Sequence, residues 1–409
     1  MSPNFAQIAL DEALERIRAA AERIRPHARR TPTVYSYTFS ESSGSDVWLK
    51  LENLQRTGSF KLRGALNKIL LLEPSERARG LVAASAGNHA QGVALAARIS
   101  GASATIVMPR GTPLNKVQRT EGYGAQVLLE GESYDESQAA ATALAAARGA
   151  TLVHPFDDPH VIEGQGTVAL EILEEVPDLD TLVVPIGGGG LICGIALALK
   201  ALAPQVRLVG VQASGAAPMV HSFASKQRET VDSPRTIADG IRVGAPGEHT
   251  LPLVLRLVDE CVSVDEPEIA EAVFQTLEKS KLVAEPAGVV AIAALVAGKV
   301  CGAKKVCALV SGGNIDLNLL ARFIENGLSN AGRYHLLKLR LADTPGELSR
   351  VLALLGSAHC NVLDVQHYRS GWKVPLGAVD VEILLETRRA DHGREVEREL
   401  AAHGFEVHA

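Results

Sequence analysis

The sequence has few of the features that mark specialised chain types. Aromatic residues make up only 4% of its 409 residues, and its 41 basic and 47 acidic side chains are intermixed. A formal net charge of −6 without blocks of lysine or arginine argues against nucleic acid as the main partner. The hydrophobic share of 46% is ordinary for a folded globular protein, so disorder or a collagen-like repeat is excluded as the main architecture.

Long apolar runs and paired cysteines are also missing. The longest apolar run, at 289–297, falls well short of the roughly 20 residues that a membrane-spanning helix needs. The N-terminal segment carries acidic residues among its apolar ones, so it does not resemble a signal peptide. The absence of a CxxC pair favours reduced thiols in a cytoplasmic protein over a disulfide framework. The five cysteines are Cys193, Cys261, Cys301, Cys307 and Cys360.

Short β-rich runs alternate with amphipathic, alanine-rich segments over most of the chain. Strand-like runs lie at 47–51, 81–84, 104–108, 127–129, 182–184, 207–211 and 306–310, and helical spacing recurs at 88–99, 136–147, 161–175 and 191–203. Because the strands are apolar throughout, this alternation predicts an α/β domain with parallel sheets covered by helices on both faces. The segment 213–248 lacks periodicity, and we expect it to run over the surface.

The last part of the chain has a different pattern. A Gly/Asn/Ser turn cluster at 326–333 predicts a linker at 329–333 between a domain at 1–328 and one at 334–409. The second domain is expected to contain strands at 334–341, 362–368, 377–385 and 405–408, and helices at 345–356 and 395–403. Strand-helix-strand-strand-helix-strand is the order of a ferredoxin-like α+β domain.

Two polar motifs each open a helix after a strand-like run. Lys61 lies in SFKLRGA (59–65). It follows Phe60, and the segment around it contains few other charged residues. Partial burial would lower the pKa of its amine toward that of a useful base, although a solvated surface lysine is the alternative. The second motif, SAGNHAQG (85–92), offers the side chains of Ser85 and Asn88 and free helix N–H groups that suit an anion. Its alternative is a plain helix cap.

Two glycine-containing turns follow further strands. Four adjacent glycines, Gly187 to Gly190, precede Leu191 and an apolar helix, and a simple turn seldom needs so much conformational freedom. The loop is neither a dinucleotide fingerprint nor a Walker A motif, and no acidic residue ends the next strand, so it predicts a cradle for a single phosphate monoester. A flexible loop is the alternative. The other turn, SGGN (311–314), predicts either a polar contact from Ser311 or another helix cap.

Metal and hydrolase chemistry find no support in the sequence. The histidines at 154, 160, 221 and 249 show neither HExxH nor Cys/His spacing, and no GxSxG elbow is present. We therefore expect no metal site.

Taken together and in this order, the four motifs resemble the fold-type II pyridoxal-phosphate enzymes, which share a tryptophan synthase β-like fold, and among them the threonine dehydratases (threonine ammonia-lyases). The resemblance covers about the first 325 residues. It implies that Lys61 binds the aldehyde of pyridoxal 5'-phosphate covalently and that Phe60 packs against its ring. The other cofactor-binding residues that it implies are Asn88 for the ring hydroxyl, Gly187, Gly188, Gly189, Gly190 and Leu191 for the phosphate, and Ser311 for the pyridine nitrogen. The substrate carboxylate would be held by Ser85, Ala86, Gly87, Asn88 and His89.

The resemblance also implies a reaction. Lys61 would remove the α-proton of L-threonine as the general base, the β-hydroxyl would leave, and hydrolysis would yield 2-oxobutanoate and ammonia. Racemases of this fold carry a second acid/base, a serine, at the position of Ala86, so we expect dehydration without racemisation. Some relatives bind a divalent ion through acidic residues where this chain has Gln212 and Pro218. An L-serine dehydratase, a β-replacement enzyme or a catalytically inactive amino-acid sensor are the alternatives.

The C-terminal domain resembles an ACT domain, a module that binds amino acids in biosynthetic enzymes. The motif that carries this resemblance is DTPGEL (343–348). It implies an amino-acid effector, such as isoleucine or valine, at Asp343, Pro345, Gly346 and Leu348. It also implies a homodimer or homotetramer, and an allosteric, feedback-controlled enzyme at the first step of isoleucine biosynthesis. An oligomerisation module without a ligand is the alternative.

Overall fold

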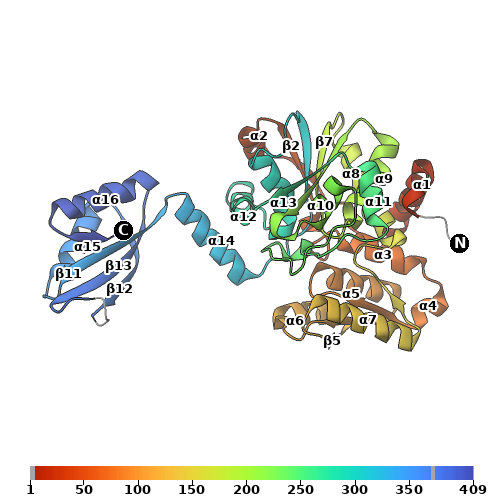
Figure 1. Ribbon diagram of the computed structural model, residues 1–409, viewed down its shortest axis with the longest axis horizontal. Helices are drawn as coiled ribbons and strands as arrows, with labels where there is room; N and C mark the ends of the chain where they lie inside the picture. The colour runs from red at the N-terminus through yellow and green to blue at the C-terminus, as the bar shows by residue number, and fades with distance from the viewer. Residues whose placement is uncertain (1–4, 370–373, 409) are drawn as a thin grey trace. The chain divides into compact units, whose positions relative to one another are not determined.

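A computed structural model describes residues 5–369 and 374–408 of the chain (Figure 1). The chain divides into two compact units, the first ending at Ile315 and the second beginning at Asp316. This division precedes helix α14 (Leu317–Asn330), whereas the sequence pattern places the linker at 329–333, which overlaps the last two residues of this helix. The turn cluster that suggested the linker includes Gly332 (φ 66°), which follows the end of this helix.

The larger sheet of the first unit has six strands in the order β1-β2-β10-β7-β8-β9. Neighbouring strands are parallel except for β1 on β2. The strands are β1 (Thr33–Tyr35), β2 (Asp46–Leu51), β7 (Thr181–Pro185), β8 (Arg207–Ala213), β9 (Glu260–Val264) and β10 (Lys305–Val310). Its central strands are buried because helices cover both faces, as the continuous apolar runs predicted.

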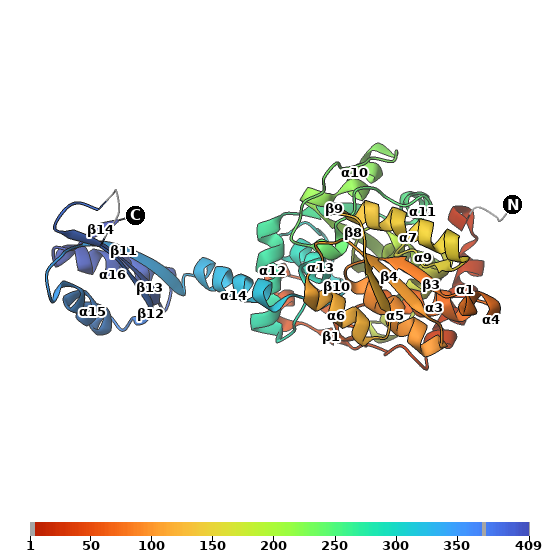
Figure 2. The ribbon, with the colours of Figure 1, turned by 90° about the horizontal axis from the view of Figure 1, so that it is seen from below.

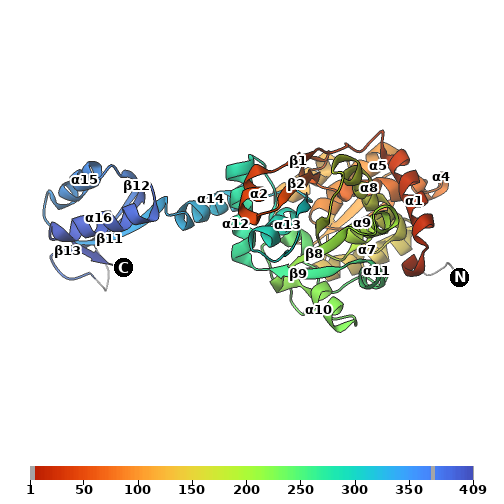
Figure 3. The same ribbon diagram turned by 90° about the horizontal axis from the view of Figure 1, so that it is seen from above.

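The helices around this sheet form two groups, visible on either side of β2 and β7 in Figure 1 and again from above in Figure 3. One group contains α1 (Leu10–Ile24), α8 (Pro159–Glu175), α9 (Gly190–Leu202) and α11 (Thr250–Leu257). The other contains α2 (Tyr37–Ser43), α12 (Glu266–Ser280) and α13 (Pro286–Val296). Helix α9 is apolar on nearly all sides and lies almost wholly in the core.

A second, smaller sheet has the order β5-β4-β3-β6, with all strands parallel. It consists of β3 (Leu81–Ala84), β4 (Ala104–Met108), β5 (Gln126–Leu129) and β6 (Thr151–Leu152). The helices of this lobe, α3 (Lys61–Leu71), α4 (Pro74–Ala78), α5 (Asn88–Ser100), α6 (Leu114–Gly122) and α7 (Tyr134–Arg148), surround it in Figure 2. Helix α3 also packs against α8, so the two lobes meet along α3.

The predicted parallel α/β architecture is confirmed, and the seven predicted strands are all present. Three short strands, β1, β6 and β9, were not predicted. The expectation for 213–248 was wrong in part, because this segment contains η3 (Ser214–Ala216), α10 (Pro218–Ser225) and η4 (Asp239–Ile241) and buries Met219 and Ile241. Elements this short do not complete enough turns to show a hydrophobic period. The remaining short elements are η1 (Phe5–Gln7) and η2 (Glu52–Leu54).

The second unit contains a four-stranded antiparallel sheet in the order β12-β13-β11-β14. Its elements are β11 (Tyr334–Ala342), α15 (Glu347–Ser357), β12 (Asn361–Tyr368), β13 (Ala378–Glu386), α16 (Ala390–Ala402) and β14 (Glu406–His408). One sheet face and the two helices share a core that includes Leu339, Val351, Val381 and Leu400. The predicted ferredoxin-like order is confirmed. In neither unit is there a helix, within the described ranges, that is long and apolar enough to cross a bilayer.

Candidate active site

Three of the four sequence motifs, SFKLRGA, SAGNHAQG and SGGN, contact one another directly, and Phe156 links the glycine loop to them. Ser59 forms an isolated antiparallel bridge with Gly312, and the N–H of Phe60 donates to Ser311 O at 3.2 Å. These contacts join the lysine motif to the SGGN turn. Helix α5 of the SAGNH motif passes so close that a Cβ on Gly92 would lie 3.1 Å from the carbonyl carbon of Lys61.

Lys61 is the first residue of α3 and is partly buried. Burial lowers the pKa of its amine to about 8, although the charge of Glu285 opposes this shift. Its Nζ donates a hydrogen bond to Pro155 O at 2.8 Å and lies 5.3 Å from the centre of the Phe60 ring. The amine is therefore held at one place and is easier to deprotonate than an exposed lysine.

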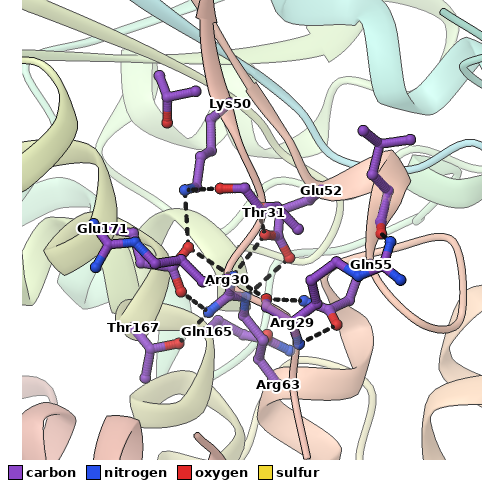
Figure 4. Close-up of polar contacts among 12 residues, drawn as sticks. Arg29, Arg30, Thr31, Lys50, Glu52, Gln55, Arg63, Gln165, Thr167 and Glu171 are labelled. Carbon is purple, nitrogen blue, oxygen red and sulfur yellow. Dashed lines mark hydrogen bonds and ion pairs between the residues drawn. The ribbon is translucent and has the colours of Figure 1, made fainter.

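A buried ionic network holds α3 two residues beyond Lys61 (Figure 4). The Arg63 guanidinium forms paired hydrogen bonds with Glu52 (2.8 and 2.9 Å) and with Glu171 of α8 (2.6 and 2.9 Å). Lys50 of β2, also fully buried, reaches Glu171 at 2.8 Å and Thr31 O at 2.7 Å. The network thus ties the first turn of α3 to β2 and α8.

The tetraglycine loop lies at the N-terminus of α9, where backbone N–H groups have no partner within the helix. Gly189 has φ 102°, a left-handed conformation that favours glycine. A Cβ on Gly188 would overlap the ring of Phe156, and one on Gly190 would lie 2.7 Å from Phe156 O. Phe156 thus leaves no room for a side chain at Gly188 or Gly190, and the backbone conformation favours glycine at residue 189.

The SAGNH loop presents backbone donors at the start of α5. Ser85 Oγ accepts a hydrogen bond from the N–H of Gly87 at 3.1 Å. His89 is buried, and its Nε2–H donates to Val153 O at 2.8 Å. Burial and the charge of Lys61 lower its pKa to about 3, so the imidazole is neutral. Its Nδ1 is buried and has no hydrogen-bond partner among the residues described.

Two residues that the sequence reasoning missed hold Asn88. Its Nδ2 donates to Glu285 Oε1 at 2.5 Å, and its Oδ1 accepts from Asn314 Nδ2 at 2.7 Å. Burial, together with the charge of Asp239, raises the pKa of Glu285 to about 7. Asn314 belongs to the SGGN motif. Glu285 immediately precedes Pro286 at the start of α13, a pattern typical of any helix N-terminus, so no local pattern in the sequence indicated its contact with Asn88.

Ser311 and His154 occupy defined positions beside the site. Ser311 is buried at the end of β10, and its hydroxyl donates to Ala287 O at 3.4 Å, a long hydrogen bond. His154 Nδ1 accepts from the N–H groups of Phe156 and Asp157, so this histidine caps a turn next to Lys61.

This set of residues fits pyridoxal 5'-phosphate. A partly buried amine of lowered pKa suits an aldehyde, a glycine cradle at a helix N-terminus suits a phosphate, and the buried Ser311 hydroxyl and Asn88 amide suit ring heteroatoms. Within the described part of the chain, no group of three or more His, Cys, Asp or Glu side chains is arranged to hold a metal ion.

A separate pocket lies within the second unit. It is lined by all four residues expected at an effector site, Asp343, Pro345, Gly346 and Leu348. His367 and Arg369 of the neighbouring strand region also line it, and Arg369 pairs with Asp343 at 3.3 Å. Gly346 has φ 99° and precedes α15.

Known proteins share this architecture. The family model described as "Pyridoxal-phosphate dependent enzyme" matches residues 24–312. Over 394 residues the chain is 48% identical to a Thermotoga maritima protein named L-threonine ammonia-lyase, covering 96% of this chain and 98% of that protein. It is similar in structure to the processed form of threonine deaminase isoform 2 from Solanum lycopersicum (TM-score 0.74, 36% identity, 77% of this chain and 87% of that one). It is also similar to maize serine racemase (TM-score 0.73, 38% identity, 78% of this chain and 98% of that one).

Proposed function

The chain belongs to the family of pyridoxal-phosphate-dependent enzymes, and from this premise we propose that it is an L-threonine ammonia-lyase that releases 2-oxobutanoate and ammonia. One observation carries the proposal. The Lys61 amine donates to Pro155 O, and the next residue, Phe156, packs against the glycine loop at the N-terminus of α9. The Lys61 amine, which would react with the cofactor aldehyde, and the glycine loop, which would bind its phosphate, thus contact adjacent residues, Pro155 and Phe156.

When bound, the cofactor supplies an electron sink for the charge that remains after the α-proton leaves. Lys61 acts as the general base that removes the proton from the substrate α-carbon. Its lowered pKa leaves a useful fraction of neutral amine near neutral pH. Ser85 and the N–H groups of residues 86–89 hold the substrate carboxylate. Asn88, fixed between Glu285 and Asn314, orients the cofactor ring.

The polar groups around the ring favour elimination over racemisation. Ser311 would offer a neutral hydroxyl, not a carboxylate, to the pyridine nitrogen of the bound cofactor, so no protein charge would favour protonation of that nitrogen, which we expect to suit β-elimination. Ala86 has no group that can transfer a proton. We assign the base to Lys61 and expect L-threonine to be dehydrated without formation of D-threonine.

The second unit is proposed to be an ACT domain that gives feedback control by isoleucine or valine. Its pocket is lined by the residues expected to contact the effector, and the alignment with the Thermotoga maritima protein extends over 96% of the chain. This control would suit the first step of isoleucine biosynthesis. We propose a homodimer or homotetramer in the cytoplasm, a location that agrees with five free cysteines.

The main test measures the visible spectrum of the purified protein and 2-oxo acid release from L-threonine. We expect a yellow protein that turns over L-threonine steadily, with a higher kcat/KM for L-threonine than for L-serine or O-acetylserine. Lys61→Ala is expected to fold and to lose turnover by several orders of magnitude. A colourless protein that releases no 2-oxo acid would overturn the proposal, and faster turnover of L-serine would make it an L-serine dehydratase.

A further inference from the structure

One short segment contacts three of the four motifs at the site. It follows β6 and comprises residues 153–157, with the sequence VHPFD. Val153 O accepts from His89 Nε2, and Pro155 O accepts from Lys61 Nζ, both at 2.8 Å. Phe156 lies directly against the glycine loop. The side chain of the last residue of this segment, Asp157, instead bonds to residues 248–250, just before and at the start of α11.

The Asp157 carboxylate accepts three backbone hydrogen bonds from the segment that begins α11. Its Oδ2 accepts from the N–H of Glu248 at 2.8 Å, and its Oδ1 accepts from those of His249 at 3.0 Å and Thr250 at 3.2 Å. Hydrogen bonds to an ionised acceptor are stronger than neutral ones, and this carboxylate also lies at the N-terminal end of a helix. Asp157 therefore holds residues 248–250 in a defined conformation.

Thr250 transmits this order to the glycine loop. It is fully buried, and its Oγ1 donates to Gly188 O at 2.6 Å while accepting from the N–H of Gly247 at 3.1 Å. A Cβ on Gly189 would lie 2.8 Å from the Thr250 Cβ, so the Thr250 side chain packs against the loop.

The orientation of Gly188 O decides where the next N–H points. The carbonyl of Gly188 and the N–H of Gly189 belong to one planar, trans peptide unit, so they point in opposite directions. Fixing the carbonyl on Thr250 aims that N–H away from Thr250. Four consecutive glycines have no side chains to restrict their backbone, so the loop needs such an external contact to keep its donors aligned.

We propose that Asp157 and Thr250 are positioning residues for the cofactor phosphate. Asp157 orders residues 248–250, and Thr250 fixes the peptide between Gly188 and Gly189, so that the loop is preorganised for the anion before it binds. This inference rests on the proposed function for the identity of the anion, and it deepens that function by adding two residues outside the four motifs.

The test compares two aldehydes on the full-length protein after removal of its cofactor. Pyridoxal 5'-phosphate and pyridoxal both react with Lys61, but only the first carries the phosphate. Thr250→Val, which keeps the side-chain shape and removes the donor, is expected to raise the Kd for pyridoxal 5'-phosphate about tenfold or more, because Gly188 O loses its partner. The Kd for pyridoxal should stay within about twofold of wild type. Thr250→Ser, which retains the hydroxyl, should restore most of the affinity for the phosphate ester.

Asp157 provides the second pair of variants. Asp157→Ala removes all three acceptor contacts and should weaken binding of the phosphate ester selectively, whereas Asp157→Asn keeps one carbonyl acceptor and should fall between wild type and alanine. Thermal unfolding of each cofactor-free variant checks folding, and should Thr250→Val not fold, Asp157→Asn carries the comparison.

Three outcomes would overturn the inference. Equal weakening of both aldehydes would show a general loss of structure, and unchanged affinity for both would show that the loop needs no support from Thr250. A wild-type protein that bound neither aldehyde would overturn the proposed function and this inference together, so the two failures are distinguishable.

Discussion

The carboxylate of Glu285 lies 2.5 Å from the amide nitrogen of Asn88, although the two residues are 197 positions apart in the chain. This contact joins the start of α13 in the larger lobe to the start of α5 in the smaller one. Since Asn88 is expected to contact the cofactor ring, the charge on Glu285 is coupled to the site by one hydrogen bond. Burial raises the pKa of Glu285 to about 7, so this charge changes in the physiological range.

Glu285 should make stability depend on pH. In the folded protein the carboxyl keeps its proton up to about pH 7, whereas in the unfolded chain it loses it near 4.5, so folding is favoured less as the pH rises through this window. The full effect is about 3 kcal/mol. Glu285→Gln should remove this fall in the free energy of unfolding, measured by urea denaturation between pH 5 and 8. Parallel curves for the two proteins would show that Glu285 does not titrate in this range.

Lys61 should capture aldehyde with an unusual pH dependence. Only the neutral amine reacts, and burial lowers its pKa to about 8 from 10.5, so the capture rate should rise up to about pH 8 and then level off. The measurement is the rate at which the cofactor-free protein becomes yellow with pyridoxal 5'-phosphate, with a free alkyl amine as the reference. A rate that keeps rising beyond pH 10, as for the free amine, would contradict the lowered pKa.

Arg63 should be among the most costly residues to remove. Arg63→Met leaves the fully buried Glu52 without its main partner, and breaking a buried ion pair in this way costs about 3–5 kcal/mol of folding free energy. Arg25→Met, which breaks an exposed pair with Glu22, is the matched control and should cost less than about 1 kcal/mol. Chemical denaturation measures both. The double variant Arg63→Met/Glu52→Gln should recover part of the loss, since no buried charge at residue 52 then remains.

Gly188 should tolerate no side chain. A methyl group there would overlap the Phe156 ring, so Gly188→Ala must displace either the ring or the loop, and we expect at least a tenfold weaker affinity for pyridoxal 5'-phosphate. Gly111→Ala is the control, because a Cβ at that position meets nothing within 4 Å. Equal affinities of the two variants would show that the loop has more room than the structure gives it.

The second unit should carry the response to effectors. Isoleucine or valine should change the turnover of the full-length enzyme, and Gly346→Val should remove that change, because φ 99° at this position strains any β-branched residue within the pocket. Gly356→Ala, in open space on α15, should respond like the wild type. An unaltered response in Gly346→Val would place the effector elsewhere.

The amino-acid sequence by itself determined the architecture and the four motifs. Apolar runs and helical spacing are local properties, so strands such as β3 and helices such as α5 could be predicted almost to the residue. Lys61 and the glycine loop could also be identified because their chemistry is concentrated within a few consecutive residues.

Tertiary structure alone decided what surrounds these motifs. Glu285, Asp157 and Thr250 act on residues 62 to 197 positions away, through hydrogen bonds that no local pattern encodes. The lowered pKa of Lys61 likewise depends on desolvation by elements distant in the chain. Each motif consists of adjacent residues and is visible in the sequence. The pKa values and orientations of its side chains arise only when the packed fold excludes water and brings distant polar groups together.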